Sequence, residues 1–233
     1  AGGTNYYQSK DEALVSPDRR TTILPFVMAG TTTDAQSKVG QVLDVAERAD
    51  DSSGFHVLVS GGASIQHDMQ AAAESDLRTA ERFGIPIALG ILILVFGALA
   101  AAIIPLVLAL LSIVVAIGLT SFLGQFFQLS FFVTNVITMM GLAVGIDYSL
   151  FVVSRYREER RQGLEKLDAI AAAGATASRA VFFSGMTVVL ALLGMLIVPS
   201  TVFRSLAGGA ISVVIISVAI SLTLLPAIIG LLG

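Results

Sequence analysis

The residue best placed to do chemistry in this 233-residue sequence is Asp147, which Tyr148 follows directly. Residues 84–146 contain no charged side chain, and Arg155 comes eight residues after the aspartate. At 1.5 Å per helical residue, this spacing places Asp147 about 12 Å from the basic residues, well inside a hydrocarbon core about 30 Å thick. A carboxyl at that depth is costly and is by default a functional group. The chemistry open to it is reversible proton transfer.

The sequence offers Asp147 no cationic partner at membrane depth. No Lys, Arg or His lies inside another apolar segment, because Arg179 and Arg204 stand at segment ends. A structural ion pair is therefore the weaker interpretation, and we expect the carboxyl to be largely protonated at rest. Tyr148 could relay a proton or donate a hydrogen bond. Ser184, at similar depth in another apolar segment, is the third candidate, although helix serines commonly bond to their own backbone.

Two glycines predict that the helix around Asp147 packs closely against neighbours. Gly141 and Gly145 form a small-xxx-small pair, which lets another helix approach. At 100° per residue they share a side with Tyr148, whereas Asp147 falls on another side. We therefore expect a central helix that is contacted on at least two sides and does not face lipid.

The composition predicts a mainly α-helical integral membrane protein. The chain is 55% hydrophobic and 13% charged, whereas soluble domains carry about 25% charged residues. A spanning helix needs roughly 20 apolar residues. On this basis we predict a transmembrane domain, residues 84–233, with five crossings at about 85–101, 104–123, 129–153, 181–198 and 206–232.

Residues 1–83 contain most of the acidic residues and predict a partial α+β domain outside the membrane. Runs of β-branched and apolar residues that end at glycine indicate strands, and apolar residues at helical spacing indicate helices. The expected elements are a strand at 21–30, a helix at 34–49, a strand at 55–62 and a helix that runs from Ser64 towards the membrane near Arg82.

The basic residues predict the orientation of the chain. They concentrate in residues 154–180, which the positive-inside tendency places as a cytoplasmic loop. Counting back three crossings puts residues 1–83 outside the membrane. Such a domain needs a preceding signal or helix, and none occurs before Ile85. We therefore expect this sequence to be part of a longer protein with at least one upstream crossing.

Other chemistries find little support in the sequence. There is no cysteine, and His56 and His67 lack neighbours in an arrangement typical of a metal site. No phosphate-binding loop follows Gly61 and Gly62, and no nucleophile and base are paired. We therefore expect a protein that is not an enzyme, uses no metal or organic cofactor and binds no nucleic acid, with protons as its coupling ion.

The Asp147 segment resembles a known family. It is similar to the fourth transmembrane helix of the MmpL-type (MMPL) exporters in the resistance-nodulation-division (RND) superfamily, through Gly-Ile-Asp-Tyr followed by Ser-Arg-Tyr-Arg-Glu-Glu. Other segments resemble the family's fifth helix, the end of its sixth, and the last strand and helix of its first periplasmic domain. The resemblance extends from about residue 21 to the end, and its segments are 134–163, 178–199, 220–233 and 55–69.

The resemblance implies a proton-driven exporter of lipids or other hydrophobic molecules in the cell membrane. It implies that Asp147 and Tyr148 carry protons and that Ser184 belongs to the same relay. The five crossings would be helices two to six of an RND half, and residues 1–83 part of a porter-like periplasmic domain. Expected partners are membrane lipids, a hydrophobic substrate, and the family's first helix and second half, which this sequence lacks. A homo-oligomer is another arrangement that could complete the unit.

Two alternatives remain open. A SecDF-type protein uses similar proton-linked helices to assist protein translocation, and it would co-purify with a translocon. A sterol-sensing or scaffold protein of the same architecture would retain bound lipid without moving it. In that case Asp147 could be replaced without a proton-linked phenotype.

Overall fold

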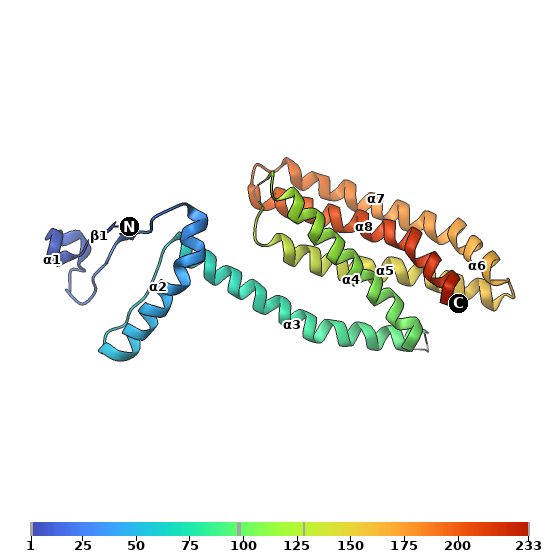
Figure 1. The fold of residues 1–233 in the computed structure, drawn as a ribbon, viewed down its shortest axis with the longest axis horizontal. Helices are drawn as coiled ribbons and strands as arrows, with labels where there is room; N and C mark the ends of the chain where they lie inside the picture. Colours follow the sequence, from blue (N-terminus) through green and yellow to red (C-terminus); the bar gives the residue numbers. More distant parts are fainter. Residues whose placement is uncertain (1, 97–98, 128, 233) are drawn as a thin grey trace. The chain divides into compact units, whose positions relative to one another are not determined.

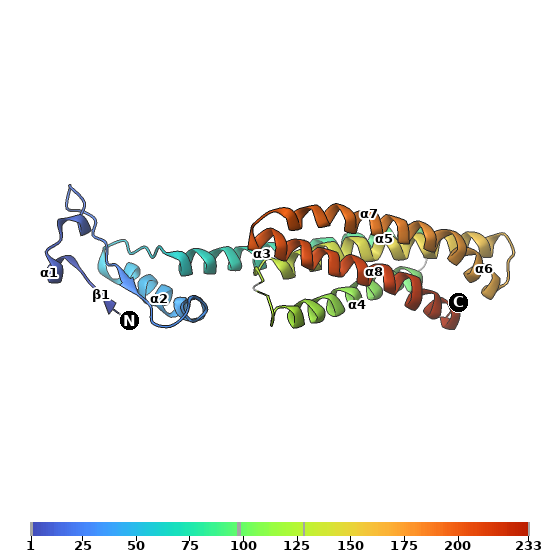
Figure 2. The same ribbon diagram turned by 90° about the horizontal axis from the view of Figure 1, so that it is seen from above.

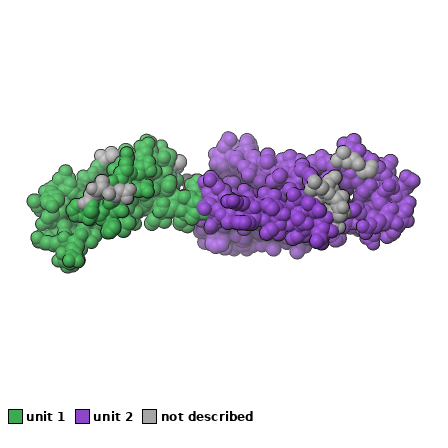
Figure 3. All heavy atoms as spheres, turned by 90° about the horizontal axis from the view of Figure 1, so that it is seen from below, with its two compact units in different colours: residues 1–72 green, residues 73–233 purple. Residues whose placement is uncertain are grey.

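The computed structural model describes residues 2–96, 99–127 and 129–232. The chain divides into two compact units, Ala1–Ala72 and Ala73–Gly233, which Figure 3 draws in different colours. We describe each unit by itself.

Unit 1 is built from short elements and one long helix. Two short strands pair antiparallel, with Gly2 opposite Val27 and Gly3 opposite Phe26. A single bridge between Val15 and Thr22 closes the loop between them. The elements are β1 (Gly2–Gly3), α1 (Tyr6–Ser9), the 3-10 turn η1 (Glu12–Leu14), β2 (Phe26–Val27), α2 (Thr32–Ser53) and the start of α3 (Gly62–Phe96).

The two helices predicted for residues 1–83 are confirmed, the one from Ser64 as part of α3, but the predicted strands are not. Residues 34–49 lie within α2, whereas the strand expected at 21–30 is reduced to Phe26–Val27. The strand expected at 55–62 was wrong, because residues 55–61 form no regular element and α3 begins at Gly62. A strand forms only where a neighbour supplies its hydrogen bonds, and no described strand lies beside this segment.

A side-chain capping box fixes the start of α2, and a glycine in the left-handed conformation ends it. The Thr31 hydroxyl accepts from the Asp34 backbone N–H, and the Asp34 carboxylate accepts from the Thr31 backbone N–H at 2.8 Å, which is a capping box. The helix stops at Gly54, which adopts φ 65°, a conformation that glycine reaches without steric cost. The backbone and side-chain hydrogen bonds from Thr31 lower the pKa of Asp34 from its ordinary value of 3.8.

This capping box makes the first turn of α2 sensitive to acid. Because the folded pKa of Asp34 lies below its ordinary value, its stabilising effect is present above that value and is lost as pH falls through the folded pKa. Hydrogen exchange at the first turn should accelerate, relative to the mid-helix amides, as pH falls below about 4. Asp34→Asn should remove this pH dependence, and Asp44→Asn on the same helix should keep it. An unchanged profile in Asp34→Asn would refute the assignment.

Unit 2 is a bundle of long helices. Figures 1 and 2 show α4, α5, α7 and α8 side by side, with α5 and α8 in contact along much of their length. Within the part of the chain that the structure describes, four helical segments are long and apolar enough to cross a membrane: Ile103–Leu123, Phe132–Arg161, Lys166–Ile197 and Thr201–Leu231. The elements are α4 (Leu99–Leu123), α5 (Val133–Arg161), α6 (Lys166–Ala173), the π-helical turn η2 (Gly174–Ser178), α7 (Arg179–Leu193), the 3-10 turn η3 (Gly194–Ile197) and α8 (Thr201–Leu232).

These four segments overlap the second to fifth predicted crossings, but the second and third segments extend into the loop expected at 154–180. The first, 85–101, falls on the apolar end of α3, and its last part includes residues 97–98, outside the described residues. The loop expected at 154–180 is helical except at 162–165. Backbone hydrogen bonding carries α5 to Arg161 and resumes at Lys166, because a helix tolerates charged residues once it leaves the apolar layer.

The core of unit 2 lies where α4, α5 and α8 meet. Its most buried side chains include Leu108 of α4, Ile137 and Val152 of α5, and Val213 and Leu225 of α8. Many large apolar side chains instead remain exposed on the outer faces of these helices. That distribution is typical of membrane helices, whose outer faces contact lipid and whose backbone groups are satisfied within each helix.

Candidate functional site

Helix α5 carries Asp147 and Tyr148 near its middle and presents them to different surroundings. Tyr148 is buried, whereas Asp147 is exposed. Asp147 belongs to an exposed row at four-residue spacing with Met139, Ala143 and Phe151, all of them apolar. The carboxyl is therefore the one ionisable group in an otherwise apolar row, and the described residues leave it uncovered.

The Tyr148 side chain extends towards α7. Its hydroxyl lies 3.5 Å from the position that a Cβ atom would occupy at Gly185 of α7. Ser184, the residue before Gly185, is exposed. Among the described residues no hydrogen bond joins Asp147, Tyr148 and Ser184 to one another. The structure thus brings the tyrosine to α7 and leaves the serine and the carboxyl unconnected.

The two glycines of α5 face its neighbours α4 and α8. A methyl group at Gly145 would lie 2.8 Å from Ala109 Cα, so the backbones of α5 and α4 meet there. A methyl group at Gly141 would lie 2.5 Å from Ile113 Cγ1 and 2.8 Å from Val213 Cγ2. Both glycines are buried on the same side of α5 as Tyr148. This close packing holds the Tyr148 side of α5 against the bundle and turns Asp147 away from it.

A pair of buried hydroxyls, which the sequence did not single out, joins α5 to α8. The hydroxyl oxygens of Ser149 and Ser221 are 3.5 Å apart, and both side chains are buried. Ser217, one turn before Ser221 on α8, is also buried, and its hydroxyl has no partner among the described atoms. The sequence signal was the i,i+4 spacing of the two α8 serines in an apolar run, which marks one helix face.

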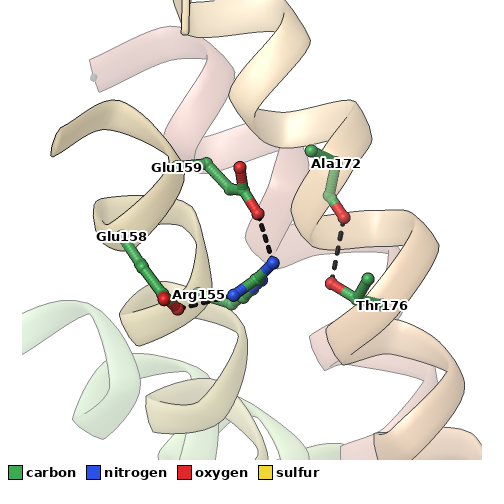
Figure 4. A network of polar contacts seen from close by, with 5 residues as sticks. All are labelled: Arg155, Glu158, Glu159, Ala172 and Thr176. Atoms are coloured by element: carbon green, nitrogen blue, oxygen red, sulfur yellow. Dashed lines mark hydrogen bonds and ion pairs between the residues drawn. The ribbon is translucent and has the colours of Figure 1, made fainter. Parts of the chain in front are cut away.

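A charged network lies near the C-terminal end of α5, after Asp147 and Tyr148 (Figure 4). Arg155 donates to Glu158 at 2.6 Å and to Glu159 at 2.6 Å. The Glu159 side chain is only 8% exposed, against 34% for Arg155 and 55% for Glu158. Facing this network, Thr176 of the π-helical turn donates to the Ala172 carbonyl at 3.0 Å. Burial of Glu159 next to a π-helical turn was not apparent from the sequence, although the i,i+4 spacing of Arg155 and Glu159 marks the pair.

Glu159→Gln should destabilise the bundle by about 3 kcal/mol, because it leaves the partly buried Arg155 without its buried counter-charge. The matched control is Glu158→Gln, which removes the more exposed partner of the same arginine and should cost less than about 1 kcal/mol. Thermal unfolding of the purified protein in detergent measures both variants. Equal midpoints for the two would contradict the buried pairing.

Comparison with known proteins decides the family. The family model described as "MMPL family" matches residues 5–233. The chain belongs to the MMPL family. MMPL proteins of this type are multi-pass proteins of the inner membrane, which agrees with the four candidate spanning segments.

The relatives of this MMPL chain have names that describe transport. It is 45% identical over 179 residues to the "Mycolic acid-containing lipids exporter MmpL11" of Mycolicibacterium smegmatis, covering 77% of this chain and 19% of that protein. It is 30% identical over 225 residues to the "Trehalose monomycolate exporter MmpL3" of Mycobacterium tuberculosis, covering 97% and 24%. A third relative, the "Heme uptake protein MmpL11" of Mycobacterium tuberculosis, is 43% identical over 174 residues, covering 75% and 18%. The chain therefore spans about a fifth of the length of these relatives.

Proposed function

We propose that this MMPL protein exports lipids or other hydrophobic molecules and is driven by protons that move the other way. The observation that carries the proposal is the Asp147-Tyr148 pair, a carboxyl in an exposed apolar row beside a tyrosine buried against α7. The exporter names of two relatives support lipid transport.

In this proposal Asp147 is the group that takes up and releases the proton. The neutral carboxyl costs little free energy in an apolar environment, and the charged carboxylate costs much more. Each protonation therefore changes the free-energy cost of keeping the Asp147 side chain in its apolar surroundings. That difference can drive a change in helix packing. Tyr148 lies next to α7 and passes or stabilises the proton there, and Ser184 is the third member of the relay.

The proposed architecture has five crossings, which include residues 85–101 at the end of α3. Residues 1–83 form part of a porter-like domain outside the membrane, and residues 154–180 lie on the cytoplasmic side. The exposed carboxyl of Asp147 requires a partner surface in the working transporter. We propose that this partner surface is either the second half of the complete transporter or a second copy of the chain.

The test is lipid movement in vesicles that contain the protein expressed from its complete reading frame. We expect export of fluorescent trehalose monomycolate when a proton gradient is imposed, and its loss after addition of an uncoupler. Transport that continues with the uncoupler would contradict the proton-driven mechanism. Retention of bound lipid without movement would favour the scaffold alternative, and co-purification of a translocon the SecDF type.

A further inference from the structure

Gly185 of α7 lies at a point where three helices meet. It is buried, its Cα faces Val218 of α8, and the Tyr148 hydroxyl of α5 lies beside it. A Cβ atom at residue 185 would overlap Val218 Cγ2 and would come within 3.5 Å of the Tyr148 hydroxyl and 3.7 Å of Tyr148 Cε2. The absence of a side chain therefore sets how closely α7 can approach both neighbours.

The obstruction at this point is the Val218 methyl group, whereas the added Cβ would be in ordinary contact with Tyr148. Val218 is β-branched, and a valine in a helix strongly prefers one side-chain rotamer, so its methyl group cannot easily turn away. Tyr148 is buried on the other side and already in contact range, so it leaves no free space into which α7 could shift. An added methyl group must therefore move α7 away from α8, and that movement separates α7 from the Tyr148 hydroxyl.

We propose that Gly185 is a positioning residue for the proton site, because its missing side chain fixes the distance between the Tyr148 hydroxyl and α7. The functional part of this inference rests on the proposed proton-driven transport. The structural part does not, because it concerns only the surroundings of one tyrosine. The residue that precedes Gly185 is Ser184, so the same displacement would also move the third member of the proposed relay.

Gly194, which begins η3 directly after α7, is a matched control. It has a helical backbone conformation, and a Cβ atom there would meet nothing within 4 Å. Val218→Ala supplies a second test, because it removes the methyl group that the new side chain would strike. The double variant Gly185→Ala/Val218→Ala should therefore restore the original spacing.

The experiment uses the protein expressed from its complete reading frame and labelled with 3-fluorotyrosine. The ¹⁹F resonance of Tyr148 is assigned by its loss in Tyr148→Phe. We expect Gly185→Ala to shift this resonance, Gly194→Ala to leave it unchanged, and the double variant to return it towards the wild-type position. An unshifted resonance in Gly185→Ala would overturn the inference. If Gly185→Ala does not fold, the double variant carries the test, and its failure to fold would also overturn the inference.

Transport of fluorescent trehalose monomycolate under an imposed proton gradient is the second measurement. Gly185→Ala should lower the rate by about tenfold to a hundredfold, since a 1 Å misplacement can cost about 10²-fold. The pH dependence of transport should also change. The double variant should recover most of the transport rate and most of the wild-type pH dependence. In a second outcome, Gly185→Ala shifts the ¹⁹F resonance, but transport by the wild-type protein does not depend on the proton gradient. This outcome would support the positioning of Tyr148 and contradict the proposed function. A shifted resonance with unchanged proton-driven transport would refute the role of Gly185 in transport.

Discussion

Asp147→Asn should reduce proton-driven lipid export by at least about a hundredfold, since positioned proton transfer contributes about 10²- to 10⁴-fold. Asparagine has nearly the same shape as aspartate but cannot take up and release a proton. Because the Asp147 side chain is exposed in the described chain and asparagine keeps its size, the replacement should disturb the packing of α5 little. The protein should therefore reach the membrane in normal amounts. Export of trehalose monomycolate by vesicles under an imposed proton gradient gives the measurement.

Met139→Leu is the matched control for that experiment. Met139 lies two turns earlier in the same exposed row, carries no ionisable group and should keep wild-type export. Asp147→Glu, which retains the carboxyl on a longer side chain, should keep part of the activity. Export by Asp147→Asn at the wild-type rate would show that another group carries the proton.

Gly145→Leu should destabilise the bundle strongly. Its Cβ atom would lie 2.8 Å from Ala109 Cα and 2.9 Å from Ala109 Cβ, so it would strike the backbone of α4 instead of a side chain that can turn. Overpacking a filled core commonly costs 1–3 kcal/mol and sometimes more, and we expect about 3 kcal/mol or more here. Thermal unfolding in detergent should show a lower midpoint and reduced yield.

Gly118→Ala on α4 provides the comparison. A Cβ atom at this position meets nothing within 4 Å, so stability should remain within about 1 kcal/mol of the wild type. If Gly145→Leu were as stable as Gly118→Ala, the close approach of α4 and α5 would not be present in the membrane-embedded protein.

The long helices could be predicted from the sequence because their signal is strong and local. A run of more than sixty residues without charge leaves few structures other than membrane helices. The two ends of α2 were harder to place, because the capping box at Thr31 and the turn at Gly54 extend the helix beyond its apolar pattern in both directions. The strand expected at 55–62 required a neighbouring strand, and the strand propensity of its own residues does not show whether one is present.

The chemistry of the candidate site was only partly visible in the sequence. An aspartate at membrane depth stands out in any sequence, and so does the tyrosine beside it. Which way each side chain points depends on contacts with α4, α7 and α8, which are distant in the chain. Gly185 and the Ser149–Ser221 pair therefore emerged only from the structure, because their significance lies in residues more than thirty positions away.

Proton movement through the protein can be measured together with lipid transport. Vesicles that contain the protein expressed from its complete reading frame are loaded with a fluorescent pH indicator, and trehalose monomycolate is added under an imposed proton gradient. We expect lipid addition to accelerate dissipation of the gradient in the wild type and to have no effect in Asp147→Asn. Equal, lipid-dependent proton flux through both proteins would contradict the assignment of Asp147 as the proton carrier.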